Sequence, residues 1–140
     1  MIRAYADADL NEVLDAWYEA SLVAHSFLPA EFFVAEREEI ANRWLPVAET
    51  FVYELDSYVV GFVALIGNEV GAIFVHPGHH RQGIGRALMD HAKTLRPNLE
   101  LDVFENNAIG RHFYDAYGFS FVSAHRDSAT GQTQHRLRLK

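Results

Sequence analysis

The sequence predicts a layered α/β (α+β) fold, in which a mixed central sheet of six to seven strands carries helices on both faces. Two patterns lead to this prediction. First, apolar residues recur at helical spacing in some segments, and alternate with polar residues or form continuous runs in others. Second, Gly, Pro, Asn and Asp separate these segments. In chain order the segments read β-α-α-β-β-β-α-β-α-β-β.

The first third of the chain is predicted to be mainly helical. Residues 2–5 are expected to form a short strand. Asp9 then resembles an N-cap, and Glu12, three residues later, would complete a capping box at the start of a helix. That helix must end before Pro29, because a proline disfavours helix in the residue before it. A second helix is expected over residues 30–45, up to the next proline.

Strands dominate the rest of the chain. Asp56-Ser57 and Gly67-Asn68 are predicted turns between apolar runs, and Asn107 and Gly118 suit the two ends of a helix. Strands are expected over residues 50–55, 58–66, 70–75, 99–104, 119–124 and 134–139, with helices over residues 108–117 and from residue 84 to before Pro97.

Composition narrows the functional classes. The 140 residues, 49% hydrophobic and 22% charged, fit one globular domain over residues 1–140. No apolar run approaches the ~20 residues that span a bilayer, and the N-terminus lacks a signal-peptide layout, so a cytoplasmic protein without membrane contact is expected. A net charge of −7 argues against nucleic acid as a partner. With no cysteine, the chain has no disulfide, thiolate metal site or cysteine nucleophile.

A glycine turn, His80-Arg81-Gln82-Gly83-Ile84-Gly85, joins a predicted strand to a predicted helix and is followed by Arg86. Glycines allow a close approach of the backbone, and the unpaired first amides of a helix attract an anion such as a diphosphate. The P-loop and dinucleotide patterns are absent. The two glycines could instead serve only tight packing, but the histidines and arginines between residues 76 and 86, without an acid, favour the anion.

Three histidines before and at the start of this turn, His76, His79 and His80, also raise the possibility of a metal site. They lie in a loop with no carboxylate nearby in the sequence, whereas catalytic zinc prefers a third well-placed ligand. Contact with phosphate explains these histidines better, so no metal is predicted.

At this point the chain resembles a known family. Residues 75–89, VHPGHHRQGIGRALM, look like the acyl-CoA signature Gln/Arg-x-x-Gly-x-Gly/Ala of the GNAT superfamily of N-acetyltransferases, with His80 in the Gln/Arg position. Residues 107–119, NAIGRHFYDAYGF, are similar to the family's Asn-x-x-Ala-x-x-Leu/Phe-Tyr-x-x-x-Gly-Phe, with Gly110 in the small-residue position. The resemblance covers nearly the whole chain, and implies the GNAT fold of a small bacterial acetyltransferase.

The resemblance implies acetyl-CoA as the co-substrate. Its pantetheine arm would lie between two strands that splay apart, the one ending at Val75 and the one over residues 99–104. The main chain of residues 73–75 would pair with the arm, the glycine turn would take the diphosphate, and Asn107 would either bind the cofactor amide or act as a plain N-cap. The implied cofactor-binding residues are Ile73, Phe74, Val75, His80, Arg81, Gln82, Gly83, Ile84, Gly85, Arg86 and Asn107.

Tyr114 is the candidate general acid, because the departing thiolate gains from a nearby proton donor; an aromatic that merely packs is the alternative. Glu69 is the candidate base, since strand alternation would place it on one face with Gly71, Ile73 and Val75. An exposed acid beside a turn, with an ordered water as base, is the alternative.

The loop between the first two helices is expected to form the acceptor site. His25-Ser-Phe27 resembles a His-x-Phe element of a subgroup of small bacterial acetyltransferases, so His25 and Phe27 are candidate substrate-binding residues. His25 could contact the acceptor or assist proton transfer, or simply end a helix.

The leading hypothesis is N-acetylation of a primary amine by direct attack in a ternary complex. The acceptor could be a small molecule or a peptide, and the enzyme a monomer or a homodimer. The alternatives are a non-catalytic CoA-binding regulator and transfer to a protein N-terminus or lysine.

Overall fold

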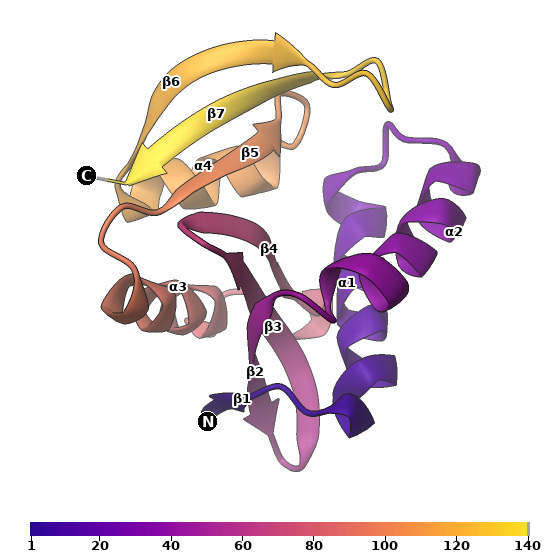
Figure 1. Cartoon of the computed structure of the whole chain (residues 1–140), viewed down its shortest axis with the longest axis vertical. Coiled ribbons are helices and arrows are strands. Elements are labelled where there is room, and N and C mark those ends of the chain that lie inside the picture. Colours follow the sequence, from indigo (N-terminus) through magenta and orange to yellow (C-terminus); the bar gives the residue numbers. More distant parts are fainter. Residues whose placement is uncertain (140) are drawn as a thin grey trace.

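A computed structural model describes residues 1–139, while Lys140, the last residue of the expected domain, lies outside this range. Seven strands form one sheet in the order β1-β2-β3-β4-β5-β7-β6 (Figure 1). The elements are β1 (Ile2–Ala4), α1 (Leu10–Ala24), α2 (Ala30–Glu39), η2 (Ile40–Trp44), β2 (Glu49–Leu55), β3 (Tyr58–Ile66), β4 (Glu69–Val75), η3 (Pro77–His79), α3 (Ile84–Leu95), β5 (Glu100–Phe104), α4 (Ala108–Tyr117), β6 (Phe119–Arg126) and β7 (Thr133–Leu139). This order confirms the predicted one.

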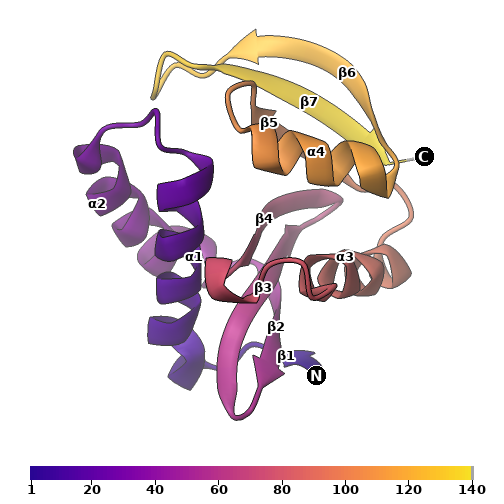
Figure 2. The same cartoon turned by 180° about the vertical axis from the view of Figure 1, so that it is seen from behind.

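The helices cover both faces of the sheet, as predicted (Figures 1 and 2). On one face, α3 and α4 pack on a cluster that includes Leu88, Met89 and Leu101. On the other, α1 and α2 pack on a cluster with Trp17 and Phe62. Strand β3 contributes to both clusters, because alternate side chains of a strand point to opposite faces. It is therefore almost entirely buried.

The sheet is continuous only in part. Strands β1 to β4 are antiparallel, and β5, β7 and β6 form a second antiparallel set. The two sets join through a parallel contact between β4 and β5 that pairs only Glu69 with Glu100. Beyond this pair the strands separate, which confirms the predicted splay. The main chain at the end of β4 therefore pairs with β3 on one side and has no strand on the other within residues 1–139.

A bulge in β4 overturns one sequence-based placement. Ala72 pairs with Ala64 of β3 and Val70 pairs with Leu65, so Gly71 is an extra residue. Side-chain alternation is shifted at this point, and Val70 packs in the same cluster as Ile73. The prediction that Glu69 shares a face with Ile73 and Val75 is therefore wrong: Glu69 starts β4 on the opposite face.

The predicted capping box is also absent. The carboxylate of Asp9 lies in a short 3-10 turn, where it accepts hydrogen bonds from both terminal nitrogens of Arg3 at 2.8 and 2.9 Å and from the amide of Ala6 at 2.9 Å. The carboxylate of Glu12 accepts from the amide of Val59 at 3.0 Å and so ties α1 to β3. Asp9 thus caps the 3-10 turn before α1 and not α1 itself, while Glu12 is engaged by a partner 47 residues away.

The second helical segment changes its winding. It is α-helical to Glu39 and continues as the π-helical turn η2, closed by a bond of 2.9 Å from the amide of Leu45 to the carbonyl of Ile40. It ends at Trp44, with Leu45 as its C-cap residue, one residue before the expected end at residue 45. No helix within residues 1–139 has the length and apolar character to cross a bilayer.

Candidate active site

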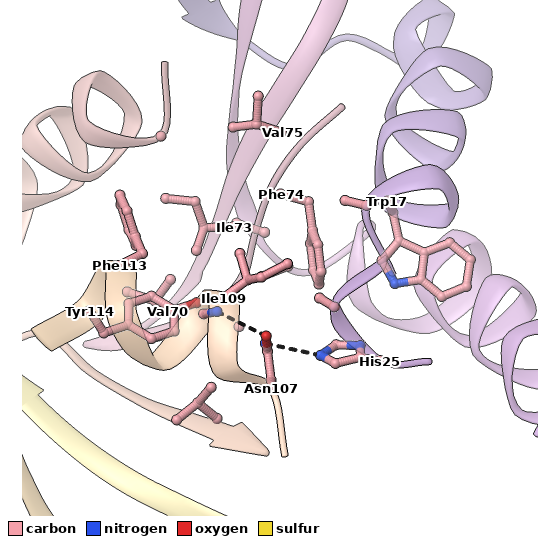
Figure 3. Close-up of a pocket in the computed structure, with 18 of the residues that line it drawn as sticks. Trp17, His25, Val70, Ile73, Phe74, Val75, Asn107, Ile109, Phe113 and Tyr114 are labelled. Atoms are coloured by element: carbon pink, nitrogen blue, oxygen red, sulfur yellow. Dashed lines mark hydrogen bonds between the residues drawn. The ribbon is translucent and has the colours of Figure 1, made fainter. Parts of the chain in front are cut away.

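The splayed strands open onto a cleft of about 1270 Å³. Its walls come from β4, the glycine turn, α3, β5 and α4 on one side, and from α1, α2 and the turn between β6 and β7 on the other. Figure 3 shows Ile73, Phe74 and Val75 of β4 above Tyr114 and Asn107 of α4, with His25 and Trp17 toward α1. The cleft thus brings together the predicted cofactor, catalytic and acceptor residues, with the exception of Gln82 and Phe27, which do not line it.

The glycine turn has a demanding backbone. Gly83 is the N-cap residue of α3 with φ +79°, and Arg81 also has a positive φ, +64°. A Cβ on Gly83 would meet nothing within 4 Å, so the glycine is required for its conformation and not for space. No side chain from residues 1–139 caps α3, which leaves its first amides available to an anion. These features fit a diphosphate.

Gly85 serves a different purpose. A Cβ at this position would lie 3.3 Å from Cε1 of Phe113 and 3.8 Å from Cγ2 of Val75. The space left by the missing side chain therefore allows Phe113 of α4 to close against the first turn of α3. Of the two glycines, one sets the backbone of the turn and the other sets the packing beneath it.

His80 and Arg86 are placed by protein contacts. Nε2 of His80 lies 2.8 Å from the carbonyl oxygen of Val75, so it carries the proton and donates it. This bond folds the turn back onto the end of β4. The guanidinium of Arg86 lies 5.6 Å from the ring centre of Tyr117. Among residues 1–139, no three His, Asp or Glu side chains are grouped as metal ligands would be.

Tyr114 lines the cleft from α4, and its ring packs on Phe113 and Phe119 with ring centres 5.4 and 5.6 Å apart. Burial raises the pKa of its phenol above the ordinary value. The phenol therefore stays protonated near neutral pH, as a proton donor must. The ring of Tyr114 therefore packs on its aromatic neighbours and also lines the cleft, so its packing is compatible with the acid role that remains a prediction.

Asn107 connects α4 to α1. Its side-chain oxygen accepts from the amide of Gly110 at 2.8 Å, which is the N-cap bond predicted for α4. Its side-chain nitrogen lies 3.3 Å from Nε2 of His25 (Figure 3). The ring of His25 lies against the rings of Phe104, Phe27 and Phe74, with centres 5.1, 6.0 and 6.2 Å away. Burial lowers the pKa of His25 to about 4.

Glu69 lines the cleft but is engaged. Both its carboxylate oxygens accept from the guanidinium of Arg136 of β7, at 2.8 and 2.6 Å. Arg136 also lies 3.1 Å from the carboxylate of Glu100 and 3.5 Å from that of Asp102. This network lies where β4 and β5 make their single pair, and it ties the two halves of the sheet together.

Sequence reasoning missed Glu36 of α2. It lines the cleft, and burial raises the pKa of its carboxyl, with further contributions from the nearby charges of Glu39 and Asp127. The signal was available in the spacing: Phe32, Glu36 and Ile40 follow one another at four-residue intervals and so share a helix face. The acidic Glu36 between the apolar Phe32 and Ile40 on one helix face could have indicated a polar position in a cleft.

Comparison with known proteins identifies the family to which this architecture belongs. Residues 46–121 match the model of the "Acetyltransferase (GNAT) domain" family. The chain is 33% identical over 123 residues to "Peptidyl-lysine N-acetyltransferase YiaC" of Escherichia coli, which covers 87% of this chain and 84% of that protein. It is 34% identical over 139 residues to "Peptidyl-lysine N-acetyltransferase YjaB" of Salmonella typhimurium, covering 99% and 95%.

Solved structures agree. The solution structure of the apo form of YjaB from Escherichia coli has a TM-score of 0.87 and 27% identity, covering 99% of this chain and 95% of that one. The N-acetyltransferase PaiA of Thermoplasma acidophilum, solved with coenzyme A, shares the fold with a TM-score of 0.82 at 19% identity, covering 100% and 98%. The chain therefore belongs to the GNAT family and is an acetyl-CoA-dependent N-acetyltransferase.

Proposed function

We propose that this enzyme acetylates the side-chain amine of lysine residues in proteins or peptides. The observation that carries the proposal is the acceptor end of the cleft, where Glu36 lines an otherwise apolar wall that includes the aromatic rings of Trp17 and Phe32. Aromatic rings suit the long apolar stem of lysine, and the carboxylate suits its ammonium group. The names of the relatives at 33 and 34% identity point to the same acceptor class.

In this proposal the cofactor is held mainly by backbone. The edge of β4 that faces away from β3, at Ile73 to Val75, pairs with the pantetheine arm. The first amides of α3 and the turn from His80 to Gly85 hold the diphosphate, and Arg86 adds a positive charge at its rim. Support comes from the strand edge at Ile73 to Val75, which pairs with no strand on that side within residues 1–139, and from the absence of a capping side chain on α3 in the same range.

Tyr114 supplies the acid. The neutral amine attacks the thioester carbonyl, a nitrogen–carbon bond forms, and the carbon–sulfur bond breaks. The phenol of Tyr114 donates its proton to the sulfur that leaves, so the cofactor departs as a thiol, and the surplus proton of the acetylated nitrogen then restores the phenol. The raised pKa of the phenol keeps this proton in place until it is needed.

The amine must lose a proton before it attacks. A lysine amine has a pKa near 10.4 and is neutral in only about one molecule in a thousand at pH 7. Glu69 was the predicted base, but both its oxygens already accept hydrogen bonds from Arg136. We therefore propose that Glu69 holds the two strand sets together. The proton of the acceptor amine passes instead to an ordered water in the open cleft.

An acceptor panel tests the lysine proposal. Thiol release from acetyl-CoA is measured with a lysine peptide, the same peptide with arginine in place of lysine and a free N-terminus, spermidine and an aminoglycoside, and mass spectrometry locates the acetyl group. We expect the highest kcat/KM for the lysine peptide. A preference for the N-terminal amine or for either small amine overturns the proposal. The Tyr114→Phe variant serves as the control for uncatalysed acetylation.

A further inference from the structure

The orientation of the Asn107 amide is determined by its neighbours. The amide N–H of Gly110 is a donor and lies 2.8 Å from the side-chain oxygen of Asn107. With the amide turned over, its NH₂ group would face this N–H, and two donors would oppose each other. The NH₂ group therefore faces His25, 3.3 Å from Nε2.

This contact assigns the tautomer of His25. An amide NH₂ group only donates, so Nε2 of His25 must accept and cannot carry a proton. The ring is then neutral with its proton on Nδ1. The three rings around it, Phe27, Phe74 and Phe104, offer no charged group that would favour the protonated form.

Gly110 makes room for this arrangement. A Cβ at Gly110 would lie 2.5 Å from the side-chain nitrogen of Asn107 and 2.9 Å from its Cγ. Even alanine, the residue of the family pattern at this position, would displace the amide from His25. The departure from the pattern and the contact between α4 and α1 thus belong to one arrangement of Gly110, Asn107 and His25.

We propose that Asn107 is a positioning residue, which holds His25 as a neutral ring whose Nδ1–H binds an oxygen of the acceptor peptide. His25 then orients the acceptor and does not take the proton of its amine, because Nε2 already accepts from Asn107. Within residues 1–139, Nδ1 has no hydrogen-bond partner, and the ring lines the cleft. The inference rests on the proposed function, since a peptide supplies carbonyl oxygens.

Trp17 extends this donor side of the cleft. Figure 3 shows the ring of His25 between Asn107 and Trp17, with the indole nitrogen on the side of Trp17 that faces His25. An indole N–H is a donor only. Two N–H groups set among aromatic rings favour the carbonyl oxygens of a peptide main chain beside the lysine.

The tautomer is measured directly, without substrate, by long-range proton–nitrogen correlation in ¹⁵N-histidine-labelled enzyme at pH 7. We expect His25 to be protonated at Nδ1 and unprotonated at Nε2. In Asn107→Asp the carboxylate accepts, so the proton moves to Nε2; Asp remains a good helix N-cap, and the variant should fold. Asn107→Ser keeps a cap but leaves the ring free to populate both tautomers. A proton on Nε2 in the parent enzyme, or a charged ring, overturns the proposal even if no variant folds.

Kinetics separate positioning from base catalysis. His25→Phe removes the donor and is expected to raise KM for a lysine peptide about fivefold, the value of one hydrogen bond, with kcat and its pH profile retained. His25→Gln, which restores a side-chain N–H, should recover part of this loss. A fall in kcat of about 100-fold with loss of a limb of the pH profile would make His25 the base and reject the proposal. If the panel shows a different acceptor, the lysine proposal fails while the tautomer result stands.

Discussion

The two sides of the cleft are built in different ways. The cofactor side consists of backbone: a free strand edge, a turn with two positive φ angles and the uncapped start of α3. The acceptor side consists of side chains brought from α1, α2 and β5, among them His25, Glu36 and Phe104. Backbone groups depend on a few local residues, whereas a wall of side chains depends on the whole fold. Substitutions that change the backbone should therefore weaken cofactor binding, and substitutions that change side chains should alter the choice of acceptor.

Tyr114 lies where the two sides meet and should show the largest effect. Tyr114→Phe is expected to lower kcat about 100-fold or more, because the leaving thiolate loses its acid, with CoA affinity unchanged. Assays of thiol release, quenched at fixed times, measure kcat, and calorimetric titration with CoA measures the affinity. Tyr117→Phe is the matched control, since the hydroxyl of Tyr117 donates to Asp90 outside the reaction. Equal turnover of the two variants would reject the acid assignment.

Gly83→Val tests the backbone side. Valine at φ +79° costs about 1–3 kcal/mol, and the turn must change to relieve this strain, so CoA affinity should fall about tenfold or more. Gly67→Val is the control: Gly67, in the β3–β4 turn, has φ +59° and equally open surroundings. Both variants should lose thermal stability, but only Gly83→Val should lose affinity. Unchanged CoA binding in Gly83→Val contradicts the diphosphate assignment.

The burial of His25 should appear in the pH dependence of stability. Its pKa is about 4 in the folded protein and near 6.5 when unfolded, so below pH 6.5 the unfolded chain binds the extra proton. Stability should be complete above pH 6.5 and fall toward pH 4, by about 3 kcal/mol more than in His25→Phe. Urea titrations of both proteins at several pH values give the difference, in which other titrating groups cancel. Parallel curves would contradict a buried neutral histidine.

Glu36→Gln tests the charge of the acceptor side. Loss of the carboxylate is expected to raise KM for a lysine peptide about threefold, and added salt should shrink this difference. Glu31→Gln, at the exposed start of the same helix, is the control and should leave KM unchanged. The CoA affinity of both variants should match the parent. An equal KM in Glu36→Gln would remove Glu36 from the acceptor site.

Glu69→Gln should show the smallest effect on turnover. Because the Glu69–Arg136 pair is partly exposed, its loss should lower the free energy of unfolding by about 1 kcal/mol and change kcat less than about twofold. Denaturant titration and thiol-release assays measure both. A drop in kcat of about 100-fold would instead restore Glu69 as the general base.

The glycine turn and the cap at Asn107 were predictable because their features are local, whereas the splay of β4 and β5 was implied only by the family resemblance. Positive φ, an uncapped helix start and an N-cap depend on neighbours within a few residues, so the pattern around Gly83 and the cap at Asn107 could be read directly. The same local reading failed for α1: Asp9 caps the 3-10 turn that precedes it, and the carboxylate of Glu12 binds the amide of Val59 instead of closing a capping box. Capping contributes only about 1 kcal/mol, so a tertiary partner readily replaces it.

Strand alternation carried the prediction for Glu69 and failed at one residue. The bulge at Gly71 shifts the period, and Arg136, 67 residues away in sequence, then takes both carboxylate oxygens. A glycine within a strand is a known sign of a bulge. The face on which the residues before the bulge lie, however, depends on the pairing of β4 with β3.

The residue pattern alone was enough for the order of elements and the cofactor turn, because these follow from hydrophobic period and local backbone geometry. The family was indicated by the resemblance of residues 75–89 and 107–119 to two family motifs. The acceptor side required the folded molecule. His25 and Asn107 are 82 positions apart, and only packing of α1 against α4 brings an amide and an imidazole within 3.3 Å. A periodic residue pattern cannot predict such a contact, because the contact depends on how the helices pack on the whole core.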